Sequence, residues 1–467
     1  MTALSPYHDL IASKRVSFSA TGLDRVPELN PAMFPHQRHS TEFALRNGRA
    51  ALFLDTGLGK SLCALDWGRV IVEETNKPVL MLAPLAVAGQ HEREAHKFGI
   101  DAKAVREPNE IGSARVYITN YDRLDKFDAA QFGGIILDES SIIKSFNGQT
   151  SRRLISTFAR TPYRLACTAT PAPNDHAELG MHSEFLGTLS QSQMLVRWFL
   201  HDSADTGTWR MKGHAVEDFW SWVASWARCV SKPSDLGFSD DGFALPPLEL
   251  IRHVVAADRG LDAGEEKDGQ AKLFRIPETS ATSIHREKRL TIEARADRLA
   301  EIIAAEPNEP WVVWCDTDYE ADALTDRIPH AVEVRGSMRP DVKEDRITAF
   351  STGQAKIIIT KPSVAGFGLN WQHCARMGFV GLSFSYESYY QAIRRCWRFG
   401  QKRPVNVHVA MADTEAAIWD VVSRKAGDHD AMKAQMVAAM SRASHTVSEI
   451  EDYTPNKKAR LPAWMAA

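Results

Sequence analysis

The sequence predicts an α/β protein with two parallel-sheet lobes and a helical, tryptophan-rich insertion between them. Three observations lead to this fold class. Short apolar runs alternate with helical patterns over residues 50–166, the same rhythm returns from residue 311 onward, and the stretch between them has a different composition. Short, continuously apolar runs between helices are typical of parallel strands that helices cover on both faces.

Five apolar runs are the expected strands of the first lobe. They cover residues 50–54, 79–83, 116–119, 135–137 and 164–166. A helix is expected over residues 60–75, because Leu62, Leu65, Val70 and Ile71 recur at near-helical spacing before Asn76 and Pro78 end the pattern. The first two strands and this helix therefore form one strand–helix–strand unit.

The second lobe has a matching set of five expected strands. They cover residues 311–315, 332–334, 356–360, 377–381 and 405–410. We expect the chain to divide into an N-terminal segment and first lobe (1–185), a helical insertion and linker (186–290), a second lobe (291–427) and a C-terminal tail (428–467).

Two stretches outside the lobes have aromatic or methionine residues at helical spacing. Phe219, Trp222 and Trp226 lie three and four residues apart, which favours a buried helix face over a platform on which bases stack. In the tail, methionines 432, 436 and 440 recur every four residues, which predicts a docked helix followed by a frayed end.

Composition narrows the class of protein. The 56 Lys and Arg against 59 Asp and Glu give a formal charge of −3, so a polyanion must be met by local basic patches. The six cysteines include no CxxC pair, which argues against a zinc knuckle or a disulfide framework and fits a reducing compartment. No apolar run approaches the roughly 20 residues that a membrane span needs, so we expect no membrane partner.

A glycine-containing loop, residues 54–61, directly follows the first expected strand and opens the first helix. Gly57 and Gly59 permit positive φ, so that backbone N–H groups can surround a triphosphate at a helix N-terminus. Lys60 would reach the β- and γ-phosphates, and Ser61 would bind Mg²⁺. Leu54 stands at the first glycine position of the strict pattern, which leaves a plain glycine-rich turn as the alternative.

An acidic pair, Asp138 and Glu139, ends another strand of the same expected sheet. One carboxylate there can hold Mg²⁺ and its neighbour can orient or deprotonate the attacking water. The alternative is a solvated acidic turn, which Lys60 at the same sheet edge makes the weaker interpretation.

An ordered series of motifs over residues 34–425 resembles the superfamily 2 helicases and translocases, and among them the Snf2-like group. The matching segments are residues 34–37, 55–61, 82–85, 118–122, 138–141, 168–171, 245–247, 335–337, 346–350, 366–371 and 391–401. The last of these, QAIRRCWRFGQ, is the most diagnostic. The group's own phosphate loop also lacks the first glycine. The resemblance implies two RecA-like lobes.

The resemblance implies that ATP and Mg²⁺ bind between the lobes. The residues it assigns to the nucleotide are Gln37, Thr56, Gly57, Leu58, Gly59, Lys60, Ser61, Gly368 and Gln391, with Ser61 and Asp138 at the metal. The residues expected to act in catalysis are Lys60, Asp138, Glu139, Arg395 and Arg398. Arg395 and Arg398 lie three apart, so on a helix both would project from one face toward the γ-phosphate. Taken alone, they would be a solvated basic face.

A nucleic acid that spans both lobes is the implied partner. Its expected contacts are Pro84, Asn120, Tyr121, Ser337, Lys361, Asn370 and Trp371, which would hold phosphates without reading bases. Each of these residues could equally be a capping or turn residue.

The function expected from these motifs is that of a DNA-dependent ATPase that translocates on double-stranded DNA. Two alternatives stay open: a helicase that separates DNA or RNA strands, and an ATP-gated clamp that recruits a nuclease or a replication or repair protein. The compact motif set is similar to that of bacterial and bacteriophage members, which implies the cytoplasm of a bacterial or phage-infected cell.

Overall fold

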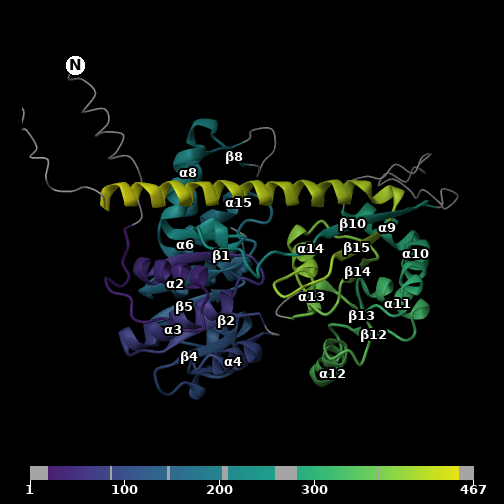
Figure 1. The fold of residues 1–467 in the computed structure, drawn as a ribbon, viewed down its shortest axis with the longest axis horizontal. Coiled ribbons are helices and arrows are strands. Elements are labelled where there is room, and N and C mark those ends of the chain that lie inside the picture. The colour runs from purple at the N-terminus through teal and green to yellow at the C-terminus, as the bar shows by residue number, and fades with distance from the viewer. Residues whose placement is uncertain are drawn as a thin grey trace, which may run out of the picture.

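The computed structural model describes residues 19–84, 87–144, 148–201, 209–257, 281–365 and 369–451, which form two α/β lobes side by side (Figure 1). The first lobe holds a seven-stranded sheet in the order β3-β4-β2-β5-β6-β1-β9 and the second a six-stranded sheet in the order β10-β15-β14-β11-β13-β12. Every strand pairing in both sheets is parallel. The predicted fold class is therefore confirmed.

The strands of the first sheet are β1 (Arg49–Leu54), β2 (Val79–Ala83), β3 (Ala102–Ala104), β4 (Val116–Asn120), β5 (Gly134–Asp138), β6 (Tyr163–Cys167) and β9 (Ala227–Val230). Those of the second are β10 (Leu248–Val255), β11 (Trp311–Trp314), β12 (Val332–Val334), β13 (Ile357–Thr360), β14 (Arg376–Phe379) and β15 (Val405–Ala412). A separate antiparallel hairpin joins β7 (Phe199–His201) to β8 (Trp209–Met211).

The helices of the first lobe are α2 (Pro35–Asn47), α3 (Lys60–Thr75), α4 (Ala88–Lys97), α5 (Gln149–Thr157), α6 (Leu179–Leu186), α7 (Gln191–Trp198) and α8 (Val216–Trp226). The later helices are α9 (Ala281–Leu290), α10 (Ile292–Ala305), α11 (Asp318–Arg327), α12 (Pro340–Ser351), α13 (Pro362–Ala365), α14 (Tyr386–Ile393) and α15 (Ala416–Glu451). Short 3₁₀ turns cover Pro108–Glu110, Tyr121–Lys126, Ala129–Gln131, Ser140–Ile143, His176–Glu178, Gly213–Ala215, Pro233–Leu236 and Asp413–Glu415.

The apolar runs that predicted strands are buried on both faces of each sheet. In β1, Ala51 and Phe53 belong to one core cluster, whereas Leu52 and Leu54 belong to the cluster on the opposite face. This division follows from the alternation of side chains along a strand. Helices cover both faces, so no strand of the central sheet needs a polar side, and the carboxyl ends of β1 and β5 meet at the edge where the phosphate loop and the acidic pair lie.

The stretch that we expected to be an insertion and linker contributes a strand to each sheet. β9 pairs with β1 in the first sheet, and β10 pairs with β15 in the second. The tryptophans at helical spacing are buried, since Trp222 and Trp226 of α8 are 3% and 0% exposed and pack in the core of the first lobe. The interpretation as a buried helix face is therefore confirmed.

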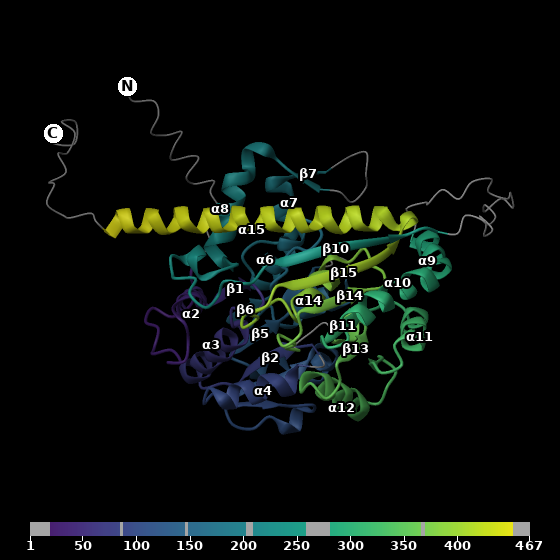
Figure 2. The same ribbon diagram turned by 45° about the vertical axis from the view of Figure 1, so that its right-hand side comes forward.

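Helix α15 runs along both lobes, as two views of the ribbon show (Figures 1 and 2). Ile418 and Val422 near its start pack in the core of the second lobe, whereas Met432, Met436 and Met440 pack in the core of the first. The methionine spacing thus identified a docked helix, and this helix passes without interruption through the boundary expected after residue 427.

Direct polar contacts also join the lobes. Lys144 of the first lobe forms an ion pair with Glu387 of α14, and Lys425 of α15 donates a 2.8 Å hydrogen bond to the Asn174 side chain.

None of the helices in the described part of the chain combines the length and apolarity that a membrane crossing requires.

Candidate active site

The phosphate loop lies between β1 and α3, as the sequence predicts. Gly57 and Gly59 have φ values of 98° and 82°, in the region that favours glycine. Steric contacts also require glycine at both positions. A Cβ on Gly59 would lie 2.1 Å from Gln37 Nε2, and a Cβ on Gly57 would lie 2.8 Å from the backbone nitrogen of Phe399 in the second lobe. The loop is therefore closely covered by residues from both lobes.

Gln37, at the start of α2, is held against the phosphate loop. Its Oε1 accepts a 3.0 Å hydrogen bond from the backbone N–H of Phe34, and its Nε2 donates a 2.9 Å bond to the carbonyl of Leu58. A glutamine amide has two donor hydrogens and two acceptor lone pairs. One donor and one acceptor of Gln37 are left for a ligand. The Leu58 side chain itself is buried in the core.

Lys60 and Ser61 form the first turn of α3 and line a cleft between the lobes. The Lys60 ammonium donates a 2.8 Å hydrogen bond to the carbonyl of Leu54. Burial lowers the pKa of Lys60, against the opposing charges of Glu139 and Asp138. The ammonium therefore lies at the end of the loop, facing the acidic pair.

The acidic pair follows β5 at the same sheet edge. Glu139 has a φ of 52°, which is rare for a residue with a side chain and is found mostly where function demands it. Burial raises the pKa of the Glu139 carboxyl to about 7, although the charge of Lys60 opposes this. A carboxyl with such a pKa is suited to accept a proton from water near neutral pH.

His91 is a residue of this site that the sequence reasoning missed. It lies on α4, its Nε2 is 2.8 Å from Asp138 Oδ2, and both side chains are buried. Burial lowers the pKa of His91, but the charge of Asp138 outweighs this effect and raises it overall. The backbone of Asp138 is also held in place, because the Tyr121 hydroxyl donates a 2.6 Å hydrogen bond to the Asp138 carbonyl. No motif that we recognised contains His91, so sequence reasoning had no signal for it.

The second lobe contributes three side chains from the diagnostic motif to the site. Gln391 Nε2 lies 3.5 Å from Glu139 Oε2, and Arg395 donates a 2.8 Å bond to Gln391 Oε1. Arg395 and Arg398 both donate to the carbonyl of Leu369, at 3.0 and 3.1 Å. Burial lowers the pKa of Arg395 to about 10, and Arg398 adds to this.

One expectation about these arginines is wrong in its geometry. α14 ends at Ile393, so Arg395 and Arg398 lie on the turns that follow the helix and not on one helical face. They nevertheless converge, because the Leu369 carbonyl accepts from both. The helical spacing alone could not show this, since it assumes that the helix continues.

A cleft of about 440 Å³ contains these groups. Its lining includes Gln37, Thr56, Gly57, Gly59, Lys60, Ser61, His91, Asp138 and Glu139 from the first lobe, and Asn370, Gln372, Arg395, Arg398, Phe399 and Gly400 from the second. The volume is within the range of sites that hold a nucleotide-sized ligand. The Ser61 hydroxyl and the Asp138 carboxylate are oxygen donors that fit Mg²⁺ beside a triphosphate, since this metal commonly takes one or two carboxylates and phosphate oxygens.

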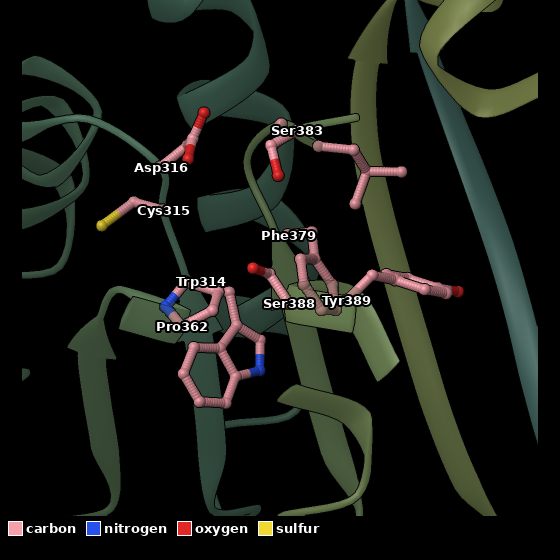
Figure 3. Close-up of a pocket in the computed structure, with 10 residues that line it drawn as sticks. Trp314, Cys315, Asp316, Pro362, Phe379, Ser383, Ser388 and Tyr389 are labelled. Atoms are coloured by element: carbon pink, nitrogen blue, oxygen red, sulfur yellow. The ribbon is translucent and has the colours of Figure 1, made fainter. Parts of the chain in front are cut away.

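A second cavity, at the carboxyl ends of β11 and β14, is much smaller (Figure 3). Trp314, Asp316, Phe379 and Ser383 line it, and its volume of about 20 Å³ holds roughly one water molecule. It is too small for a nucleotide.

Among the residues that the structure describes, no group of three or more His, Cys, Asp and Glu side chains is placed to hold a metal ion.

The residues expected to touch nucleic acid have varied positions. Ser337 is exposed, whereas Pro84 and Lys361 are half-buried and Lys361 forms a 2.9 Å ion pair with Asp318. Tyr121 and Trp371 are buried at 6% and 0% exposure, so neither side chain can meet a strand in this arrangement.

The two asparagines among these residues also differ in position. Asn120 is buried at the end of β4, and Asn370 lies in the cleft with the arginines. Gly368, expected at the nucleotide, lies outside the described residues.

Asp55, which directly follows β1 in the phosphate loop, was not assigned a role by sequence reasoning. Its buried carboxylate accepts bonds from Tyr390 (3.1 Å) and Arg394 (3.0 Å) of the second lobe and from Lys433 of α15. Burial would raise the pKa of Asp55, but Lys433 and Arg394 lower it overall. The phosphate loop is therefore tied to both the second lobe and α15.

Comparison with known proteins gives one family match and several relatives. The helicase conserved C-terminal domain matches residues 294–400. Protein p41 of Acyrthosiphon pisum secondary endosymbiont phage 1 is 23% identical over 472 residues, covering 87% of this chain and 98% of p41. The DNA annealing helicase and endonuclease ZRANB3 of Bos taurus is 23% identical over 451 residues, covering 86% of this chain and 41% of ZRANB3.

This chain therefore spans about two fifths of the length of ZRANB3, at 41%. Among solved structures, the Sulfolobus solfataricus SWI2/SNF2 ATPase core in complex with dsDNA is 17% identical, covers 88% of this chain and 96% of that chain, and has a TM-score of 0.42.

The helicase conserved C-terminal domain and the relatives agree with the resemblance that the ordered motifs indicate. The chain is similar to the superfamily 2 helicases and translocases, and among them to the Snf2-like group. The two parallel sheets correspond to the two RecA-like lobes that this resemblance implies.

Proposed function

We propose that this protein is a DNA-dependent ATPase that hydrolyses ATP between its lobes and translocates on double-stranded DNA. The observation that carries the proposal is the shared cleft: Lys60 and Glu139 of the first lobe line the same cavity as Arg395 and Arg398 of the second. Hydrolysis in such a site depends on how the lobes are arranged, which is what a motor requires.

Each group has a role in the proposed reaction. The phosphate loop and Lys60 bind the triphosphate, while Ser61 and Asp138 would hold Mg²⁺, which neutralises charge on the phosphates. Glu139 orients the attacking water and accepts its proton. His91, bonded to the Asp138 carboxylate, fixes the direction in which that carboxylate points.

The arginines provide the link between hydrolysis and the lobes. Both guanidinium groups donate to the Leu369 carbonyl, within their own lobe. To stabilise charge on the γ-phosphate, one or both must exchange this carbonyl for a phosphate oxygen. We infer that nucleic acid bound across both lobes favours this exchange, so that turnover is fast only on DNA.

The decisive measurement is the rate of ATP hydrolysis with duplex DNA, single-stranded DNA, RNA or no nucleic acid. We expect the largest stimulation with duplex DNA. Lys60→Ala should abolish turnover in every condition while the circular dichroism spectrum stays that of the parent, because the side chain lines a cleft. Equal rates with and without every nucleic acid would contradict a motor.

A second activity is worth testing because of the relatives. ZRANB3 is named a DNA annealing helicase, and this chain matches about two fifths of it. Forked DNA and RNA substrates with labelled strands would distinguish three outcomes: annealing, strand separation, or translocation that leaves both strands paired. An ATP-gated clamp without repeated turnover would instead show a single round of hydrolysis for each binding event.

A further inference from the structure

Three phenylalanine rings meet at one end of the cleft. Phe34 precedes α2, Phe243 lies in the segment that leads from the first lobe into β10, and Phe399 follows Arg398 within the diagnostic motif of the second lobe. The ring centroids of Phe34 and Phe243 are 5.1 Å apart, and those of Phe243 and Phe399 are 4.7 Å apart. All three residues line the same cavity as Lys60 and Ser61.

These rings are not fully enclosed, although Phe243 packs against the apolar core of the first lobe and its ring centroid lies 4.8 Å from that of His36. Phe34 is 46% exposed and Phe399 is 37% exposed, and Phe243 is half-buried between them. Single exposed apolar residues are ordinary, but an exposed aromatic cluster from three separate segments inside a cleft indicates a ligand with a flat apolar face.

Polar groups beside the rings specify the ligand further. The backbone N–H of Phe34 holds the Gln37 amide, which keeps one donor and one acceptor for a partner. Phe399 packs against Gly57 of the phosphate loop. Along the cleft, an aromatic surface is followed by a donor–acceptor pair and then by a phosphate loop. This spatial order is complementary to the base and the phosphates of a purine nucleoside triphosphate.

We propose that Phe243 binds the nucleobase of ATP by stacking, with Phe399 extending the same aromatic surface from the second lobe. This inference rests on the proposed function and adds a specificity residue to it. Phe243 lies outside every motif that we recognised, in the segment that joins the lobes. Occupation of the base site would therefore hold the first lobe, the joining segment and the second lobe together.

The test compares two probes that differ in the base. ATP carries one, whereas inorganic tripolyphosphate offers only the phosphate chain. Binding of each to the full chain with Mg²⁺ is measured by titration calorimetry. Phe243→Ala should weaken ATP binding by roughly 10-fold, the loss expected for one base–aromatic stack, and leave tripolyphosphate binding within about 2-fold of the parent.

Further variants separate stacking from folding. Phe243→Trp should restore ATP binding, because any flat aromatic ring can stack. Phe243→Leu keeps the apolar packing and should still lose affinity for ATP only, which covers the case in which the alanine variant fails to fold. The matched control is Phe238→Ala, since Phe238 lies in the same segment but packs on His39 and does not line the cleft; both probes should bind it as they bind the parent.

Two results would overturn the inference: equal weakening of ATP and tripolyphosphate by Phe243→Ala, or no weakening of either. A parent protein that binds neither probe would instead contradict the proposed function, and this inference with it.

Discussion

At the scale of single residues, the site shows how burial tunes charge. Glu139 combines a positive φ with a pKa raised to about 7 by burial, and it faces Lys60 and Gln391. Both features have a cost in folding free energy. Such a cost is typical of residues selected for chemistry and not for stability.

The first prediction concerns Glu139. Glu139→Gln keeps the size of the side chain but removes its ability to accept a proton. We expect ATP binding to persist while kcat falls by about 10²- to 10⁴-fold, the usual contribution of a general base. Single-turnover hydrolysis with labelled ATP checks this. If the glutamine variant hydrolyses ATP at the rate of the parent, Glu139 is not the base.

The second prediction concerns Arg395. Arg395→Lys keeps a positive charge but loses the planar fork that serves two acceptors. We expect kcat in the presence of duplex DNA to fall at least about 100-fold, with the KM for ATP changed by only a few-fold. Arg403→Lys is the matched control, because Arg403 pairs with Glu309 outside the cleft. A control variant as impaired as Arg395→Lys would contradict the assignment.

At the scale of elements, helix α15 is the feature that ties the nucleotide loop to the rest of the fold. Lys433 of α15 and Arg394, just after α14, both pair with Asp55, and all three side chains are buried. Removing one partner of a buried ion pair leaves a charge without compensation, which is costly. The position of the phosphate loop therefore depends on the position of α15.

The third prediction concerns this network. Lys433→Met should lower the free energy of unfolding by about 3 kcal/mol, because Asp55 is left with fewer partners. Lys425→Met removes a more exposed contact between α15 and the first lobe and should cost less than about 1 kcal/mol. Urea denaturation of both variants, and of Asp55→Asn alone and combined with Lys433→Met, provides the measurement. Strictly additive losses in the double variant would show that the two residues do not interact.

At the scale of the whole molecule, buried histidines contribute to the response to acid. Burial lowers the pKa of His182 and of His408 to about 4, and that of His429 to about 3. An unfolded chain has histidine pKa values near 6.5, so it binds more protons than the folded chain between pH 6.5 and about 4. Each of these three histidines therefore contributes a decrease in the free energy of unfolding as the pH drops through 6.5, whereas Glu139 and His91, whose pKa values are raised, contribute in the opposite direction.

The fourth prediction follows from this difference. His182 is fully buried, with its Nε2 3.1 Å from the Ser140 hydroxyl. His182→Phe removes one of the titrating rings, so the loss of stability between pH 8 and pH 5 should be smaller than in the parent by about 2 kcal/mol. Urea denaturation at the two pH values measures this difference. An unchanged loss would mean that His182 does not remain neutral in the folded chain.

The sequence predicted the strands with continuous apolar runs, because such runs have few other stable positions. Val79–Ala83 is an example, and the structure has β2 at those residues. The search for apolar runs missed β3, whose three residues include a lysine, and β10, whose edge position leaves polar residues in the strand. Short and edge strands have little pattern of their own, so tertiary pairing decides them.

The residues of the candidate site also fall into two groups, those that a local pattern predicts and those that depend on a distant segment. Residues within motifs, such as Lys60 and Glu139, could be named because their spacing relates directly to phosphate chemistry. The contact between Asp55 and Lys433 joins residues 378 positions apart, and no local pattern encodes it. His91 and Phe243 escaped notice for the same reason, since each has its role only through a partner from a distant segment.

The path of α15 also has a consequence for biosynthesis. Met432, Met436 and Met440 complete the apolar interior of a lobe whose first strand begins at Arg49. On the ribosome, the first lobe must therefore wait with part of its interior open until α15 has been made. Exposed apolar surface in that interval is where aggregation begins and where chaperones act.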